Sequence, residues 1–345
     1  MLYSALTYTC NNSPALCSRS YSNITHLGAH DSPFLSNATN KYQSAGNQFF
    51  NTTTQLDAGV RLLSAQIHTT NSSTTELRLC HSDCSLLDSG SLVTWLEEIR
   101  TWMDNNANEV VTLLLVNSVS AEAGRIGADF TSSGISKYAY AGGSTASSTW
   151  PTLQSLISAN TRLVTFVASL PSGNTAAPYL FDEFTYIYEN PFTVLSPSNF
   201  SCLPDRPAIV RGSASSAKSS GRMFLMNHFL DKEQLFGIQT PDVDKTASTN
   251  SPDPSITGSL GNAAQTCSTT YGSAPNFILV DYFNVGPAMS TVDTLNGVGN
   301  NVVGRKSVTQ SILSQSFTGA GNGASRRSTI ALVLGLGATF VASLI

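Results

Sequence analysis

Residues 110–116 read Val-Val-Thr-Leu-Leu-Leu-Val, a run of strand length without a charged side chain. A strand that is apolar on both faces is typical of a parallel sheet covered by helices on both sides. An amphipathic segment at 92–103, which Ser91 can cap, and a segment at 152–159 are the expected helices. This alternation predicts one α/β domain, a distorted or incomplete TIM (β/α) barrel. Seven barrel strands are recognisable, at 24–29, 61–68, 110–116, 162–168, 186–189, 222–228 and 276–283.

The polar surface comes mainly from uncharged residues. Charged residues are 12% of the 345-residue chain, about half the usual share. Serine, threonine, asparagine and glycine replace them, as is typical of secreted glycoproteins. The net charge of −4 and the lack of a Lys/Arg cluster argue against a nucleic-acid partner.

The six cysteines also favour the secretory pathway. Their spacing favours three disulfides, Cys10–Cys17, Cys80–Cys84 and Cys202–Cys267, although six cysteines allow fifteen connectivities. A zinc site is the alternative for Cys80 and Cys84, but the sequence has no second pair so closely spaced. Glycosylation acceptors of the form Asn-x-Ser/Thr are expected at Asn11, Asn23, Asn37, Asn51, Asn71 and Asn199.

The C-terminus resembles a targeting signal. Small residues at 319–325 are followed by a polar spacer at 326–329 and a charge-free stretch at 330–345. As a helix this stretch would be about 24 Å long, shorter than the roughly 30 Å hydrocarbon core. The pattern predicts replacement by a glycosylphosphatidylinositol (GPI) anchor, with Asn322 as the attachment residue, although a tail-anchored helix is an alternative. The barrel domain would then be residues 1–318, with a long loop insertion near 239–275.

The N-terminus does not match this prediction. Residues 1–9 have neither a basic segment nor an apolar core of signal-peptide type. Because a GPI anchor requires entry into the secretory pathway, we expect that the true signal peptide is missing from this sequence. The predicted location is extracellular, at the cell surface or cell wall.

Candidate chemical groups follow the predicted strands. His30 and Asp31 end the first run, His81 ends an extended run at 76–81, and Asp281 lies in the last run. The carboxyl ends of barrel strands meet at one face, so these groups are expected to share a site. One imidazole can take a proton from an attacking hydroxyl while the other gives one to a leaving oxygen. A carboxylate can orient the base.

These residues resemble a known family. Gly28-Ala-His-Asp-Ser32, Gly59-Val-Arg61, His81 and Val280-Asp-Tyr-Phe-Asn284 look like the X domain of phosphatidylinositol-specific phospholipase C, and most of all like fungal secreted phospholipase-C-like phosphodiesterases. The resemblance implies a distorted TIM barrel that cleaves inositol-lipid phosphodiesters. It implies that His30 is the base on the inositol 2-hydroxyl and His81 the acid for the diacylglycerol oxygen. Asp281 would orient His30, and Asp31 would assist at the leaving group.

The second predicted strand departs from the family pattern. Where relatives carry an Asp–Arg pair or acidic calcium ligands, this chain has Ser64 and Gln66, followed by His68. These three residues share one face of a strand and are expected to contact substrate. No metal or other cofactor is expected. His68 or Arg211 is a candidate replacement for the missing counter-charge on phosphate.

The sequence also predicts roles for four other residues. His228 ends a strand and is a candidate substrate contact, and Glu189 is a weaker one. His26 is expected to be structural, and Arg61 to form a buried salt bridge.

The preferred function is a phospholipase-C-type phosphoric diester hydrolase that cleaves inositol-lipid or related phosphodiesters, and the protein is expected to be a monomer. One alternative is a catalytically degenerate, GPI-anchored surface or cell-wall binding protein. Another is a metal-dependent relative acting on sphingolipid or glycerophosphodiester head groups.

Overall fold

A computed structural model describes residues 8–70, 73–143, 145–146, 149–171, 175–234 and 237–314. The predictions for the N-terminal signal, for Asn71 and for the C-terminal anchor at Asn322 concern residues that lie outside these ranges, except for Tyr8 and Thr9. Within the part of the chain that the structure describes, no helix combines the length and apolar character needed to cross a bilayer.

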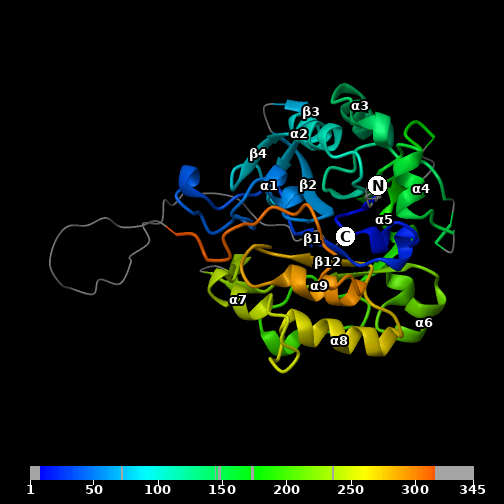
Figure 1. Ribbon diagram of the computed structural model, residues 1–345. Coiled ribbons are helices and arrows are strands. Elements are labelled where there is room, and N and C mark those ends of the chain that lie inside the picture. The colour runs from blue at the N-terminus through cyan, green and yellow to red at the C-terminus, as the bar shows by residue number, and fades with distance from the viewer. Residues whose placement is uncertain are drawn as a thin grey trace, which may run out of the picture. The chain divides into compact units, whose positions relative to one another are not determined.

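The fold is built on an eight-stranded parallel sheet that curls into an incomplete barrel (Figure 1). Its strand order is β7-β6-β5-β2-β1-β12-β9-β8. The strands are β1 (His26–Ala29), β2 (Leu62–Thr70), β5 (Val111–Asn117), β6 (Leu163–Ala168), β7 (Leu180–Asp182), β8 (Ile187–Glu189), β9 (Met223–Asn227) and β12 (Phe277–Val280). A one-turn helix, α5 (Glu183–Tyr186), connects the two end strands, β7 and β8. The predicted α/β barrel is therefore confirmed.

Two short antiparallel units complete the strands. β3 (Ser73–Cys80) pairs with β2 and with β4 (Asp88–Ser91), so this hairpin continues from the barrel wall. β10 (Asp231–Glu233) pairs with β11 (Gln239–Pro241) in a separate two-stranded sheet. The extended run predicted at 76–81 thus belongs to the hairpin and not to the barrel.

Helices cover the outside of the barrel. In Figure 1, α1, α2 and α3 lie on one side of β1 and β12, and α8 and α9 lie on the other. Ser91 accepts a hydrogen bond from Thr94 N–H at 3.1 Å and caps α2, as predicted. The helices are α1 (Thr52–Asp57), α2 (Leu92–Asn105), α3 (Ala123–Ser132), α4 (Leu153–Ser158), α5, α6 (Ala214–Ser219), α7 (Thr246–Thr249), α8 (Leu260–Tyr271) and α9 (Ala288–Asn296). Short 3-10 turns occupy Pro14–Leu16, Tyr21–Asn23, Ala38–Asn40, Ile135–Tyr138, Pro197–Asn199, Ala208–Val210 and Val243–Lys245.

The barrel strands separate two apolar clusters. One fills the barrel interior and includes Leu62, Phe166 and Leu279. The other lies between the sheet and the helices and includes Leu63, Met226 and Ile278. Because successive side chains of a strand point to opposite faces, neighbouring residues of one strand enter different clusters.

Gly28 allows the interior to close at β1. A Cβ atom there would lie 2.7 Å from Leu279 and 2.8 Å from Leu62, closer than real Cβ contacts allow. His30 is two residues after Gly28 and therefore points to the same side, the barrel interior. The first interior side chain after Gly28 is thus that of the candidate base.

Two predictions about elements are wrong. β7 was not among the seven predicted strands. Residues 239–275 are not a structureless loop, since they contain β11, α7 and the 12-residue helix α8. Leu260, Ala264, Cys267 and Tyr271 form the buried side of α8, and the polar residues between them face outward.

The covalent and ionic predictions for the framework are confirmed. The three disulfides are Cys10–Cys17, Cys80–Cys84 and Cys202–Cys267. Arg61 forms a buried salt bridge with Glu109 at 2.6 Å. His26 is buried, with its Nε2 atom 3.4 Å from the Tyr21 carbonyl, in keeping with a structural role.

The glycosylation acceptors differ in accessibility. Asn23, Asn51 and Asn199 are exposed and Asn37 is partly exposed. Asn11 is only 5% exposed, and its Oδ1 accepts a hydrogen bond from Val110 N–H at 2.7 Å. A glycan on Asn11 has no room in the folded protein, so that prediction is wrong for the native state.

Residues 298–314, which we call the C-terminal strap, run along the outside of the barrel. Val303 N–H donates to the Asn12 carbonyl at 2.8 Å, and Lys306 N–H donates to the Asp57 carbonyl at 2.9 Å. Further along, Asn284 Nδ2 donates to the Thr309 carbonyl at 2.8 Å. Leu313 packs against a small cluster that contains Phe49 and Tyr282. The strap therefore ends beside the residue that follows Asp281.

Candidate active site

His30 and Asp281 meet because their strands are neighbours in register. β1 pairs with β12 so that Ala29 lies opposite Val280, which places the next residues, His30 and Asp281, side by side. The Nδ1 atom of His30 lies 2.8 Å from Oδ1 of Asp281. With Nδ1–H donated to this carboxylate, the Nε2 atom of His30 is left for proton transfer. The predicted pairing of these two residues is present.

Asp31 lies between the two histidines. Its Oδ2 atom is 3.7 Å from Nε2 of His30 and 3.5 Å from Nε2 of His81. The two Nε2 atoms are therefore no farther apart than the sum of these distances. The side chains of His30 and His81 keep 20% and 13% of their exposure, so both are reachable from solvent. The structure thus brings together all four residues predicted to be catalytic.

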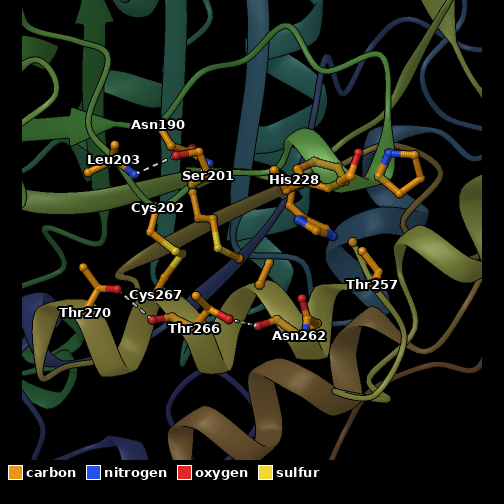
Figure 2. Close-up of a pocket in the computed structure, with 16 residues that line it drawn as sticks. Asn190, Ser201, Cys202, Leu203, His228, Thr257, Asn262, Thr266, Cys267 and Thr270 are labelled. Atoms are coloured by element: carbon orange, nitrogen blue, oxygen red, sulfur yellow. Dashed lines mark hydrogen bonds between the residues drawn. A yellow bond between two sulfur atoms is a disulfide. The ribbon is translucent and has the colours of Figure 1, made fainter.

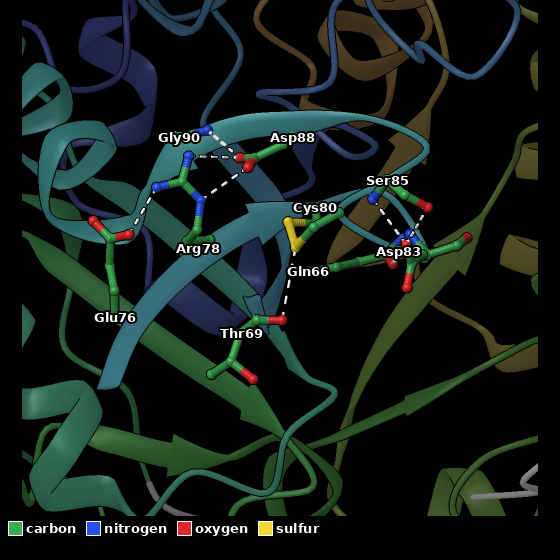
Figure 3. Close-up of a disulfide and its surroundings, with 11 residues drawn as sticks. Gln66, Thr69, Glu76, Arg78, Cys80, Asp83, Ser85, Asp88 and Gly90 are labelled. Atoms are coloured by element: carbon green, nitrogen blue, oxygen red, sulfur yellow. Dashed lines mark hydrogen bonds and ion pairs between the residues drawn. A yellow bond between two sulfur atoms is a disulfide. The ribbon is translucent and has the colours of Figure 1, made fainter. Parts of the chain in front are cut away.

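The β3–β4 hairpin carries His81 to this place. β3 runs antiparallel to β2, with His68 opposite Arg78, so its last residues return over the carboxyl end of the barrel. The Cys80–Cys84 disulfide (Figure 3) closes the short turn that begins with His81. His81 N–H donates to the Leu87 carbonyl at 2.9 Å, which further fixes this turn. The half-cystines cannot act as thiolate metal ligands, and this removes the zinc alternative for Cys80 and Cys84.

Ser64 and Gln66 hold Asp31 from the adjacent strand. Asp31 N–H donates to Ser64 Oγ at 2.8 Å, and Gln66 Nε2 donates to Asp31 Oδ2 at 2.7 Å. Gln66 Oε1 also accepts from Ser82 N–H at 2.9 Å, so one amide links Asp31 to the turn after His81. In this structure both residues position the catalytic candidates. Substrate contact by Ser64 and Gln66 stays a prediction.

His68 lies farther along β2. It is partly buried, and its Nε2 atom has no hydrogen-bond partner among the described residues. Burial lowers the pKa of His68, while Asp83 and Asp31 act in the opposite direction. The neutral form is therefore favoured in the free protein, which weakens the idea that His68 supplies a positive charge for phosphate.

Three other candidates lie elsewhere. His228 points to the outer side of β9, where its Nε2 atom lies 3.0 Å from the Thr249 carbonyl. Arg211 is largely exposed and pairs with Asp205 at 3.2 Å. Glu189 is buried in an ion pair with Arg206 and accepts a hydrogen bond from Asn227 at 2.8 Å. The predictions that His228 shares the His30 site and that Arg211 replaces the family arginine are not supported by these positions.

The two histidines have opposite electrostatic environments. Burial disfavours the charged form of His30, but the nearby Asp31 and Asp281 carboxylates outweigh it and raise the pKa of His30 to about 9. For His81, burial lowers the pKa and the neighbouring His30 adds to this, with Asp31 opposing. In the free protein near neutral pH, His30 is mainly the protonated imidazole and His81 mainly the neutral one.

Four residues at the site were not predicted from the sequence. Asn47 Nδ2 donates to Asp281 Oδ1 at 3.0 Å, and Gln48 Nε2 donates to the His30 carbonyl at 2.8 Å. Phe229 stacks on the His30 ring with a centroid distance of 3.7 Å. Burial, together with the charge of Asp281, raises the pKa of Asp231 to about 7. Phe229 and Asp231 closely follow a predicted strand end, a signal that could have been used, whereas Asn47 and Gln48 lie in an irregular segment.

The backbone adopts a left-handed conformation at the residue that follows each of three catalytic candidates. Asp31, Ser82 and Tyr282 follow His30, His81 and Asp281, and have φ angles of 47°, 59° and 43°. Non-glycine residues rarely adopt this left-handed region, and such residues gather at functional sites. The turns that present the three side chains are therefore held by tertiary contacts and not by local preference.

Comparisons with known proteins agree with this geometry. The family model PI-PLC X 1 matches residues 16–296, which is most of the chain. The chain belongs to the PI-PLC X family. The fungus Arthroderma benhamiae has a relative named PI-PLC X domain-containing protein 1, which is 36% identical over 291 residues, covering 84% of this chain and 90% of the relative. A second relative from this fungus, an uncharacterized secreted protein, is 35% identical and is aligned over 86% of this chain and 65% of its own length.

Solved structures of bacterial PI-PLC proteins share the fold. The phosphatidylinositol-specific phospholipase C of Listeria monocytogenes has 16% identity and a TM-score of 0.53, with coverage of 84% of this chain and 98% of that chain. A mutant of the Staphylococcus aureus phosphatidylinositol-specific phospholipase C has 12% identity and a TM-score of 0.54, with the same coverages. These likenesses support the barrel architecture. At family level, the match places the chain among the phospholipase-C-like phosphodiesterases.

Proposed function

We propose that this protein is a phosphoric diester hydrolase of phosphatidylinositol-specific phospholipase C type, with an inositol-lipid or related phosphodiester as its substrate. The observation that carries the proposal is that the Nε2 atoms of His30 and His81 approach the same oxygen of Asp31, from two distant parts of the chain. Two imidazoles so arranged can serve as a base and an acid in one displacement at phosphorus.

In the proposed reaction, His30 Nε2 takes the proton of the inositol 2-hydroxyl. That oxygen attacks phosphorus, and the bond to the diacylglycerol oxygen breaks. His81 gives its proton to this leaving oxygen. Asp281 holds His30 through Nδ1, and Asp31, which faces both Nε2 atoms, stabilises whichever imidazole carries the proton. Oδ2 of Asp281 is buried and has no hydrogen-bond partner among the described residues.

The number of protons in the free site suits this reaction. One proton is shared by the pair, but it resides mainly on His30, because the pKa of His30 is raised to about 9 and that of His81 is lowered. The proposed roles need the reverse arrangement, a minor state that substrate binding must select. A mechanism in which His81 is the base and His30 the acid needs the same total number of protons.

The test of the function is release of water-soluble inositol phosphate from vesicles that contain phosphatidylinositol. His30→Ala and His81→Ala are each expected to lower the rate by about 10²–10⁴-fold. Asn199→Gln, at an exposed position outside the site, serves as the matched control and should keep the rate. If both histidine variants retain the wild-type rate, the two-histidine mechanism is excluded.

A specific observation supports a second candidate, a catalytically degenerate surface or cell-wall binding protein. The developing negative charge on phosphorus needs a counter-charge, and that interaction is often a large part of catalysis. The ion partners of Asp31 among the described residues are His30 and His81, and Gln66 occupies the place of a family charge. Binding of inositol-lipid vesicles without turnover, unchanged by His81→Ala, would favour this candidate.

We also propose that the protein is secreted, attached by a GPI anchor near Asn322 and monomeric, with a membrane lipid as its substrate partner. The sequence pattern at 319–345, the exposed acceptors Asn23, Asn51 and Asn199, and the three disulfides support the extracellular route. Release of the protein from cells by an added bacterial phospholipase that cleaves GPI anchors tests the attachment. Loss of lipid hydrolysis in chelator would instead support the metal-dependent alternative.

A further inference from the structure

A cavity of about 340 Å³ lies on the opposite side of β9 from the candidate active site (Figure 2). His228 and Met226 contribute to it from the outer face of β9, and α8 forms the facing wall. The next residue after His228 is Phe229, whose ring stacks on His30 inside the barrel. The cavity and the His30 site are thus separated by the thickness of one strand. A volume of this size is at the lower end of the range for small-molecule sites.

His228 leaves one hydrogen-bond acceptor without a partner in this cavity. The residue is fully buried, and its Nε2 atom lies 3.0 Å from the Thr249 carbonyl, so Nε2 carries the proton that is donated there. Nδ1 is then a lone-pair acceptor, and it has no partner among the described residues. Figure 2 shows the ring directed from β9 toward α8 and Asn262. A buried acceptor without a donor is unfavourable, and a bound donor would remove this cost.

The other lining groups also favour a ligand with hydroxyl donors. Thr266 and Thr270 donate their hydroxyl protons to helix carbonyls at 2.8 and 3.0 Å, so their oxygens keep lone pairs for the cavity. Burial lowers the pKa of His228 to about 4, so the ring is neutral at physiological pH. The lining residues include no Asp, Glu, Lys or Arg. Neither a cation nor an anion is matched by such a lining.

Phe200 supplies an apolar surface beside these acceptors. Its ring stacks on His228 with centroids 4.2 Å apart, and it lines the cavity together with the Cys202–Cys267 disulfide. Sugars and cyclitols combine hydroxyl donors on their edges with apolar C–H faces, so they match both kinds of surface. Asn199, an exposed glycosylation acceptor, directly precedes Phe200.

We propose that this cavity is a second binding site, for a neutral polyhydroxylated ring such as a monosaccharide or cyclitol. The hydroxyls of the ligand donate to His228 Nδ1 and to the threonine oxygens, and its apolar face packs on Phe200. The ring comes either from a free saccharide or from a glycan linked to Asn199. The site is distinct from the phosphodiester site and does not depend on the proposed reaction.

The experiment uses the secreted, glycosylated protein and its Asn199→Gln variant, which lacks the adjacent glycan but keeps every lining residue. Mannose, N-acetylglucosamine and myo-inositol are added separately at up to tens of millimolar. Binding is followed by saturation-transfer NMR and by the ¹⁵N resonance of His228 Nδ1, which shifts when this atom gains a hydrogen-bond donor. Binding of a free probe to both proteins supports a site for free saccharide. A His228 shift that depends on Asn199 glycosylation, without probe binding, supports the linked glycan.

Three single variants test whether the probe binds in this cavity. Thr266→Val removes a cavity hydroxyl and is expected to weaken binding roughly fivefold, as for one ordinary hydrogen bond. Thr269→Val removes a hydroxyl that donates to the Gln265 carbonyl at 2.9 Å on the same helix but faces outside this cavity, and it should leave binding unchanged. His228→Phe should weaken binding at least tenfold. If no probe binds to either protein and the His228 resonance is independent of the glycan, the cavity holds only water and the proposal is wrong.

Discussion

His30 and His81 carry opposite pKa shifts within one small site, and this makes the pH dependence of the proposed reaction predictable. A plot of kcat/KM for phosphatidylinositol against pH should be bell-shaped, because the His30–His81 pair is active only when it holds one proton. The alkaline limb is expected near pH 9, because the carboxylates raise the pKa of His30 to about 9. The acid limb should lie below the ordinary histidine value, because burial lowers the pKa of His81.

Asp281→Asn tests the cause of the alkaline limb. Removing this carboxylate removes part of the stabilisation of the charged His30, so the limb should move to lower pH as kcat falls. Gln265→Ala, on the exposed face of α8, is the control and should leave the profile unchanged. An alkaline limb that stays near pH 9 in Asp281→Asn would contradict this account of His30.

The bell-shaped pH profile cannot show which histidine is the base and which is the acid, but a change of leaving group in the substrate can. In an inositol phosphodiester with an aryl leaving group, departure needs little help from a general acid. If His81 is the acid, His81→Ala should lose far less activity on the aryl substrate than on the lipid, while His30→Ala should lose activity on both. If the aryl substrate restores activity to His30→Ala and not to His81→Ala, the proposed roles are reversed.

Arg61 and Glu109 show how a buried charge pair affects stability at a single position. Arg61 also donates to the Leu56 and Val60 carbonyls and to Asn12, so its charge is fully committed. Glu109→Gln leaves this guanidinium without its counter-charge and is expected to destabilise the fold by about 3–5 kcal/mol. Urea unfolding measures the change. Glu76→Gln, at the exposed pair with Arg78, should cost less than about 1 kcal/mol, and an equal loss in both variants would contradict the argument.

At the scale of elements, the Cys80–Cys84 disulfide matters for the position of His81 more than for stability. It closes a loop with a sequence separation of only 4, and Cys10–Cys17 closes one of 7. In the chain-entropy account, loss of either costs about 2 kcal/mol. The double variant Cys80→Ala/Cys84→Ala should therefore lose activity at least about tenfold, since positioning errors of an ångström are costly in catalysis.

The double variant Cys10→Ala/Cys17→Ala is the matched control for this prediction. It should lose a similar amount of stability in thermal unfolding but keep kcat near the wild-type value, because its loop is at the opposite end of β1 from His30. Equal activity losses in the two double variants would show that general destabilisation, and not the placement of His81, is the cause.

The sequence predicted the long apolar strands well because their burial on both faces leaves a clear pattern. β7 was missed, because three residues are too few to show a period, whereas the equally short β8 was recognised at 186–189. The helix α8 was missed although Leu260, Ala264, Cys267 and Tyr271 have helical spacing, because serine, threonine and asparagine fill its outer face. In this chain a surface helix therefore has the composition of a loop.

The candidate site was predictable to the extent that it follows strand ends. His30, Asp31 and Asp281 follow from the parallel register of β1 and β12. His81 follows only if the hairpin after β2 folds back, which the sequence alone does not specify. Asn47 and Gln48 could not be predicted, because their segment has no regular structure and is placed by tertiary contacts with β1 and β12.

At the scale of the whole molecule, the strap is expected to be held in two separable parts. Asn284→Ala removes the side-chain donor to Thr309, so amide hydrogen exchange should rise over residues 309–313. The portion around Val303 and Lys306 keeps its own hydrogen bonds and should stay protected. Gln310→Ala, at an exposed position, is the control. Exchange that rises along the entire strap would contradict the two-part description.

The position of this strap also bears on which lipids the protein is expected to hydrolyse. Leu313, near the end of the strap, packs against the cluster that contains Tyr282, the residue after Asp281. If the proposed GPI attachment at Asn322 is correct, the lipid is joined to the chain only a few residues after the end of the strap. We expect such a tether to favour hydrolysis of lipids in the membrane that carries the protein over lipids in a separate membrane.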